Sequence, residues 1–186
     1  MISKLLKSHL RAIPNKMSWW LWVLLVPVAL FGLVVLRGAP YVPTKRRLLD
    51  KAFTDLYQLN DKDTLVDIGS GDGVVLRAAA RRGAKAVGYE INPILVLISR
   101  LSSRSSLISV RLMDFWYAEL PLETTIIYTF GEARDIKRMY EKAELTAIAH
   151  NKVIYFMSFG FNVPGKKPFK YDGSFYLYKV KPLQRG

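Results

Sequence analysis

A short glycine-rich segment constrains the fold of this chain more than any other feature. The apolar run 65–68, Leu-Val-Asp-Ile, leads into Gly69-Ser70-Gly71-Asp72-Gly73, so three glycines stand at alternate positions. Such a pattern is typical of a buried strand that ends in a tight turn and feeds a helix whose first N–H groups face the turn. Gly71 and Gly73 lack a Cβ, as is needed where a ligand approaches the backbone closely.

The rest of the chain alternates between strand-like and helix-like segments. Strands are expected over 64–68, 86–89, 107–113, 124–129 and 152–158, and helices over 44–59, 74–82, 93–101 and 132–150. A closing antiparallel pair is expected over 168–171 and 174–180. This order predicts an α/β fold with a doubly wound, mostly parallel, Rossmann-like sheet and an antiparallel C-terminal strand pair.

Two acids fall at the ends of neighbouring expected strands. Asp67 lies at the carboxyl end of the first strand, and Glu90 ends the second. In a parallel sheet this places both carboxylates and the glycine turn around one nucleoside-binding edge. A dinucleotide fingerprint requires Gly or Ala three residues after Gly71, where this chain has Val74.

With Asp67 two residues before the first glycine, the pattern instead resembles motif I of the class I S-adenosylmethionine-dependent methyltransferases. The resemblance implies that the glycine loop passes the methionine part of S-adenosyl-L-methionine and that Glu90 binds the ribose hydroxyls. It also implies that Asp114, in the segment Asp114-Phe115-Trp116, contacts the adenine amino group. The predicted cofactor contacts are Asp67, Gly69, Ser70, Gly71, Gly73, Glu90, Asn92 and Asp114.

The flanking motifs narrow the resemblance. The segments Pro40-Tyr41-Val42-Pro43-Thr44, 87–93 (Val-Gly-Tyr-Glu-Ile-Asn-Pro) and 164–168 (Pro-Gly-Lys-Lys-Pro) resemble those of membrane-anchored protein-lysine methyltransferases. The mitochondrial members of that group modify the ATP synthase c subunit and the adenine nucleotide carrier. The resemblance therefore implies transfer of a methyl group to a lysine of a membrane protein.

An uncharged apolar segment over 17–36 precedes the predicted catalytic part. Twenty residues cover about 30 Å as a helix, the thickness of a bilayer core, so a single transmembrane helix is expected, with Pro27 as a kink or a sign of a re-entrant path. The predicted organisation is a basic amphipathic segment over 1–16, this helix, a pre-domain motif and helix over 37–60, and the methyltransferase domain over 61–186. The methyltransferase domain is expected to face the compartment that supplies S-adenosyl-L-methionine. This is the cytoplasmic side, or the matrix if the membrane is the mitochondrial inner membrane.

The formal net charge of +13 is concentrated at 1–16, 37–51 and 163–186. A basic excess beside an apolar segment favours an anionic lipid surface as the partner rather than nucleic acid. The chain has no cysteine and two histidines far apart, so no metal site is expected.

Tyr41, Tyr89 and Trp116 are candidates for an aromatic slot that receives the substrate ammonium, although core packing explains each of them as well. No general base is identified. Two alternatives to a lysine methyltransferase stay open: methylation of a lipid-soluble small molecule, and a catalytically silent membrane scaffold.

Overall fold

The computed structural model describes residues 18–37, 46–131 and 133–182, and the side chains of these residues except those of 30–37. The chain divides into two compact units, Met1–Gly38 and Ala39–Gly186. The predicted amphipathic segment over 1–16 and the motif Pro40-Tyr41-Val42-Pro43-Thr44 lie outside the described residues.

The N-terminal unit contains one helix, α1 (Trp19–Arg37), with Pro27 inside it. Its tryptophans are exposed: Trp19, Trp20 and Trp22 have 77%, 51% and 55% of their surface accessible. Among the residues that the structure describes, no helix has both the length and the apolarity needed to cross a membrane. The structure thus confirms a helix in this segment but not the predicted membrane span.

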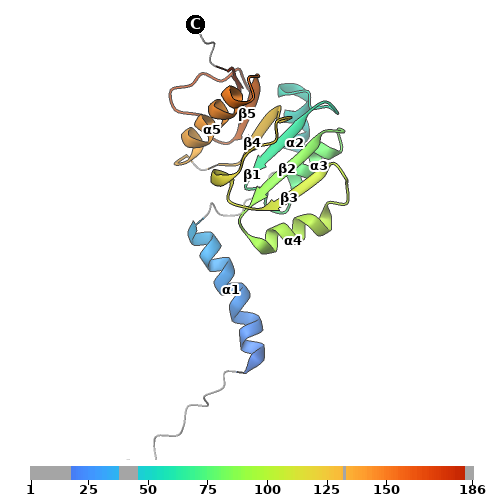
Figure 1. Cartoon of the computed structure of the whole chain (residues 1–186), viewed down its shortest axis with the longest axis vertical. Helices are drawn as coiled ribbons and strands as arrows, with labels where there is room; N and C mark the ends of the chain where they lie inside the picture. The colour runs from blue at the N-terminus through green and yellow to red at the C-terminus, as the bar shows by residue number, and fades with distance from the viewer. Residues whose placement is uncertain (1–17, 38–45, 132, 183–186) are drawn as a thin grey trace, which may run out of the picture. The chain divides into compact units, whose positions relative to one another are not determined.

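The second unit is built on a seven-stranded sheet in the order β3-β2-β1-β4-β5-β7-β6 (Figure 1). The strands are β1 (Thr64–Ile68), β2 (Lys85–Glu90), β3 (Ile108–Leu112), β4 (Ile126–Thr129), β5 (Ile154–Phe159), β6 (Lys170–Tyr171) and β7 (Phe175–Val180). The strands β1 to β5 pair in parallel, and β7 is antiparallel to both β5 and β6. The predicted fold class is confirmed in its sheet and its C-terminal pair.

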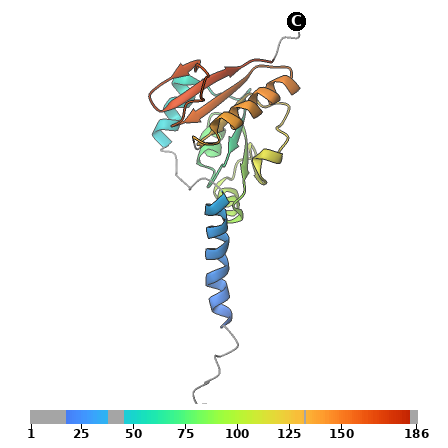
Figure 2. The same ribbon diagram turned by 90° about the vertical axis from the view of Figure 1, so that its left-hand side faces the viewer.

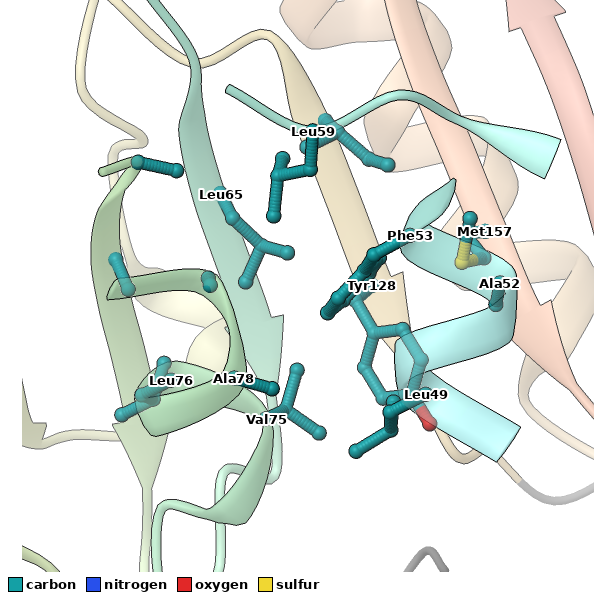
Figure 3. Close-up of a cluster of buried hydrophobic side chains, with 14 of the residues drawn as sticks. Leu49, Ala52, Phe53, Leu59, Leu65, Val75, Leu76, Ala78, Tyr128 and Met157 are labelled. Atoms are coloured by element: carbon teal, nitrogen blue, oxygen red, sulfur yellow. The ribbon is translucent and has the colours of Figure 1, made fainter. Parts of the chain in front are cut away.

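Helices cover both faces of this sheet. They are α2 (Arg46–Lys51) with the π-helical turn η1 (Ala52–Leu56), α3 (Val74–Ala80), α4 (Pro93–Ser102), the 3-10 turn η2 (Phe115–Tyr117) and α5 (Ile136–Ala149). One core cluster joins the sheet to α2, η1, α3 and α4, and part of it is drawn in Figure 3. The second cluster joins the opposite face to η2 and α5, and Figure 2 shows α5 in orange along the C-terminal strands.

Two element ends differ from the sequence-based expectation because of tertiary contacts. The helix expected to reach residue 59 ends at Leu56, since Tyr57 becomes extended and donates its hydroxyl to Asp63 Oδ1 at 2.7 Å. The fourth strand begins at Ile126 rather than at Thr124, whose hydroxyl donates to the carbonyl of Pro121 at 2.6 Å. Local hydrogen bonds of this kind compete with regular structure.

Candidate functional site

The carboxyl ends of the central strands meet at one edge of the sheet. Ile68 of β1 lies in register with Tyr89 of β2 on one side and with Thr129 of β4 on the other. The strand order reverses between β1 and β4, because β2 and β3 continue on one side and β4 and β5 on the other (Figure 1). Ligands of open α/β sheets bind at such a reversal, outside the carboxyl ends of the strands.

The glycine turn follows β1 directly at this edge. Gly69, Gly71 and Gly73 have φ values of +70°, +53° and +83°, which L side chains rarely adopt. The N–H groups of Gly69 and Ser70 both donate to the carbonyl of Tyr89, at 2.9 and 3.1 Å. A Cβ added to Gly69 would meet no atom within 4 Å. The turn therefore presents bare backbone at Gly69.

Gly73 has a different surrounding. A Cβ added there would lie 2.2 Å from Ser99 Oγ of α4. The missing side chain thus allows close packing between the turn and α4. That a ligand also approaches the backbone of Gly73 stays a prediction. The backbone of Gly73 lies at the start of α3, where it is the N-cap residue.

Glu90 ties the glycine turn to the start of α4. Its Oε2 accepts from the N–H of Gly71 at 2.9 Å, and its Oε1 accepts from the N–H of Asn92 at 2.8 Å. Asn92 in turn caps α4, with its Oδ1 accepting from the N–H of Ile94 at 2.9 Å and Pro93 in the first turn. Each carboxylate oxygen keeps a second lone pair, so Glu90 can still accept two hydroxyl donors.

Asp67 is the most unusual group at this edge. Its side chain is 2% exposed, and its Oδ2 has no hydrogen-bond partner. Burial raises the pKa of Asp67 well above its ordinary value, with further contributions from Glu90 and Asp72. Ser70 is likewise buried with an unpartnered Oγ. Buried polar atoms without partners, beside the open Gly69, fit a ligand that brings its own donors.

The raised pKa of Asp67 predicts a gain in stability when its charge is removed. The folded state holds this proton to higher pH than the unfolded state, so stability falls as pH rises from the ordinary Asp pKa toward the raised one. We expect Asp67→Asn to raise the melting temperature at neutral pH, in the absence of cofactor, and to flatten that fall. Thermal melts of both proteins from pH 4 upward measure this. An Asn variant less stable than the parent at neutral pH would contradict it.

Asp114 lies just after β3, at the same edge. The N–H of Met113 donates to the carbonyl of Glu90 at 3.0 Å, which joins this segment to the end of β2. Asp114 Oδ1 accepts from the N–H of Trp116 at 3.0 Å and so caps η2. One of its two oxygens is therefore used by the backbone, while the other remains available to an amino donor.

Two basic residues of α5 hold this turn, and sequence reasoning missed both. Lys142 Nζ donates to the carbonyls of Phe115 and Trp116, at 2.6 and 2.9 Å, and its pKa is lowered by burial. The guanidinium of Arg138 lies 4.2 Å from the centre of the Trp116 ring. Their spacing of four residues on an expected helix was the available signal, because it puts both on one face.

The three aromatic candidates separate in the structure. Tyr89 is 1% exposed and donates its hydroxyl to the carbonyl of Glu119 at 3.2 Å, so it packs in the core. Trp116 is half-buried and follows β3, at the edge of the sheet where the carboxyl ends of the strands meet. Tyr41 lies outside the described residues. Sequence reasoning missed a second aromatic group, Phe130 after β4 and Phe159 in β5, whose ring centres lie 4.9 Å apart.

No protein-family model matches the chain. It is 48% identical over 61 residues to the lysine N-methyltransferase of the ATP synthase c subunit from Rattus norvegicus, covering 33% of this chain and 27% of that protein. It is 31% identical over 105 residues to the adenine nucleotide translocase lysine N-methyltransferase of Mus musculus, covering 54% of this chain and 45% of that protein. The matches thus span less than half the length of these relatives.

Among solved structures, the chain resembles an RNA methyltransferase from Salinibacter ruber in complex with S-adenosyl-L-homocysteine. The TM-score is 0.68 and the identity 25%, over 75% of this chain and 94% of that one. This likeness agrees with the predicted fold and cofactor. The chain is related to the class I S-adenosylmethionine-dependent methyltransferases and, over part of its length, to the lysine N-methyltransferases of the ATP synthase c subunit and the adenine nucleotide translocase.

Proposed function

We propose that this chain is an S-adenosylmethionine-dependent methyltransferase that modifies a lysine side chain of a membrane protein. The observation that carries the proposal is Glu90, which ends β2 with both carboxylate oxygens bound to the backbone of the turn and of α4. A buried carboxylate fixed in this way is preorganised to accept two ribose hydroxyls. The lysine target is supported by the activities for which the two relatives above are named.

The chain's residues divide the binding of the cofactor among them. Glu90 would accept the ribose hydroxyls, Asp114 the adenine amino group, and the turn at Gly69 would leave room for the amino-acid part. The bound cofactor supplies a methyl group on a positively charged sulfur. The carboxylate of Glu90 places negative charge at this edge, which favours a cationic ligand there.

The protein must also present a neutral amine to the methyl group. A lysine loses its proton more easily where it is desolvated, because burial disfavours the charged form. Trp116 and Phe130 are half-buried aromatic side chains that follow β3 and β4, at the same edge as the cofactor residues. We propose that they line the path of the lysine, with the Phe130 ring receiving the ammonium while Trp116, already in contact with Arg138, forms the apolar wall.

We further propose that the apolar N-terminal segment attaches the chain to a membrane. Exposed tryptophans at one end of α1 and the absence of charge over 17–36 support this attachment. The catalytic unit then faces the compartment that supplies the cofactor, which is the cytoplasm or, in a mitochondrion, the matrix.

Methyl transfer into membranes tests the proposed reaction. The full chain is incubated with membranes and S-adenosylmethionine carrying a radioactive methyl group, and label is counted separately in protein and in lipid extract. We expect label in protein, recovered as methyl-lysine after hydrolysis, and at least about tenfold less with Glu90→Gln. Label in the lipid extract alone would instead indicate a lipid-soluble substrate. Cofactor binding without any transfer, or no binding by a folded chain, would contradict the enzymatic proposal.

A further inference from the structure

The helix α4 turns its apolar side chains away from the protein. Ile94, Leu97, Ile98 and Leu101 are 36%, 57%, 43% and 68% exposed, and their spacing puts them on one side of the helix. The opposite side is buried through Val96 at 3% and the small polar Ser99 at 0% exposure. Ser99 lies against the turn at Gly73, where a Cβ added to the glycine would lie 2.2 Å from Ser99 Oγ.

The edge strand of the sheet extends this apolar surface. Leu112, at the end of β3, is 54% exposed and alternates with the buried Val110 on the face that α4 covers, and α4 packs against β3 at the margin of the sheet (Figure 1). We call Leu112 together with Ile94, Leu97, Ile98 and Leu101 the α4 face. Soluble monomers rarely expose a contiguous apolar patch of this kind unless it binds something.

The segment that carries the α4 face contributes basic side chains and no acidic one. Residues 91–113 contain no acidic residue, and Arg100 and Arg104 of this segment are exposed. The third arginine of the segment, Arg111, lies on the other face of the sheet, where it donates to the hydroxyl of Tyr89 at 3.3 Å. Arg100 is fixed against the edge strand, where its Nη2 donates to the carbonyl of Val110 at 2.8 Å. Exposed leucines and isoleucines bordered by arginines match the surface of an anionic bilayer. Apolar side chains insert at the boundary between headgroups and acyl chains, and basic side chains bind the anionic headgroups.

A second copy of the chain fits this surface less well. A two-fold symmetric contact would pair the α4 face with its own copy, so the arginines of one copy would find no acidic residue of segment 91–113 opposite them. Like charges placed opposite each other oppose association. The charge therefore favours lipid over self-association.

We propose that the α4 face is a membrane-contact surface of the catalytic unit, separate from α1, that binds anionic lipid. The contact itself does not depend on the proposed methyl transfer, but its consequence does. The N-cap of α4, Asn92, is held by Glu90, so the α4 face begins at the cofactor edge. Docking by this face places that edge beside the bilayer surface and restricts the target lysine to one near the headgroups.

Single-cysteine labels test the contact on the full chain. The chain has no cysteine, so Leu97→Cys carries a nitroxide label at one position only. Leu145→Cys is the matched control, because Leu145 is also an exposed leucine, at 66%, but lies on α5 on the other side of the sheet. In vesicles containing phosphatidylserine, we expect the label at 97 to collide with oxygen more and with a water-soluble nickel chelate less than the label at 145.

The charge contribution is tested in the same vesicles. Arg104→Gln and Lys137→Gln each remove one exposed positive charge, the first beside the α4 face and the second on α5. Arg104→Gln is expected to lower the ratio of bilayer-contacting to water-exposed label at 97 about fivefold, and Lys137→Gln to leave it unchanged. Vesicles of phosphatidylcholine alone should lower it further.

Three outcomes would overturn this inference. One is equal collision with the nickel chelate at positions 97 and 145 in anionic vesicles. Another is a label at 97 that lies equally deep in phosphatidylcholine vesicles and in anionic vesicles. The third is a label at 97 that is shielded from the nickel chelate without vesicles, to a degree that grows with protein concentration, as self-association would give. Glu90→Gln should lower methyl transfer but leave the depth of the label at 97 unchanged. Failure of the proposed reaction and failure of the proposed membrane contact can therefore be told apart.

Discussion

Replacing Glu90 by Gln is expected to weaken S-adenosylmethionine binding about 100-fold. The variant keeps the size of the side chain but removes its charge, and one of its two terminal groups can no longer accept a hydrogen bond. Hydrogen bonds to a charged group contribute about 1.5–3 kcal/mol each, and loss of about 3 kcal/mol corresponds to that factor. The variant also weakens the contact from the N–H of Gly71, now 2.9 Å from the carboxylate. Isothermal titration calorimetry measures the change in dissociation constant.

The matched control for Glu90→Gln is Glu119→Gln. Glu119 is an exposed glutamate in the same unit and is not among the predicted cofactor contacts, so its replacement makes the same chemical change without removing one of them. Circular dichroism of both variants establishes that the sheet is intact. A folded Glu90→Gln protein that binds the cofactor as tightly as Glu119→Gln does would contradict the proposal that Glu90 binds the ribose hydroxyls.

The second large effect concerns stability, and it comes from Gly88→Ala. Gly88 lies inside β2, in register with Asp67 of β1. A Cβ there would lie 2.7 Å from both Ser70 Cβ and Leu76 Cδ1, distances that real Cβ atoms essentially never show. Overpacking of this kind destabilises a core by about 1–3 kcal/mol. We expect a loss of about 2 kcal/mol in the free energy of unfolding, with weaker cofactor binding because Ser70 belongs to the glycine turn.

Chemical denaturation of Gly88→Ala and of two reference variants measures this effect. Gly165→Ala adds a Cβ in open space at φ +74°, so it reports backbone strain alone, about 1–2 kcal/mol at most. Adding Ser70→Gly to Gly88→Ala removes one of the two crowded partners and should restore part of the stability. If the double variant is no more stable than Gly88→Ala alone, the crowding lies elsewhere.

The parts of the fold that depend on local sequence were predictable. The strand that ends at Ile68, the turn at Gly69 and the helix start at Asn92-Pro93 each follow from residue types within a few positions of each other. The mostly parallel sheet followed from the alternation of strands and helices, because parallel strands need crossover connections. The closing antiparallel pair followed from the Asp172-Gly173 turn between two aromatic-rich segments.

The features that sequence reasoning missed depend on contacts between distant segments. The end of η1 at Leu56 is set by the bond from Tyr57 to Asp63, and the packing role of Gly73 is set by Ser99 of α4. The hydrogen bond from Lys142 to the carbonyl of Phe115 in η2 joins residues that are 27 positions apart in the sequence. Periodicity within one segment carries no information about such pairs.

A crystal structure of the chain with S-adenosyl-L-homocysteine tests the proposed cofactor site most directly. We predict that both ribose hydroxyls lie within hydrogen-bond distance of the Glu90 carboxylate, that the amino-acid part passes Gly69, and that the adenine amino group reaches Asp114. A ligand bound away from the carboxyl ends of β1 and β2, or a ribose that Glu90 does not contact, would contradict the site.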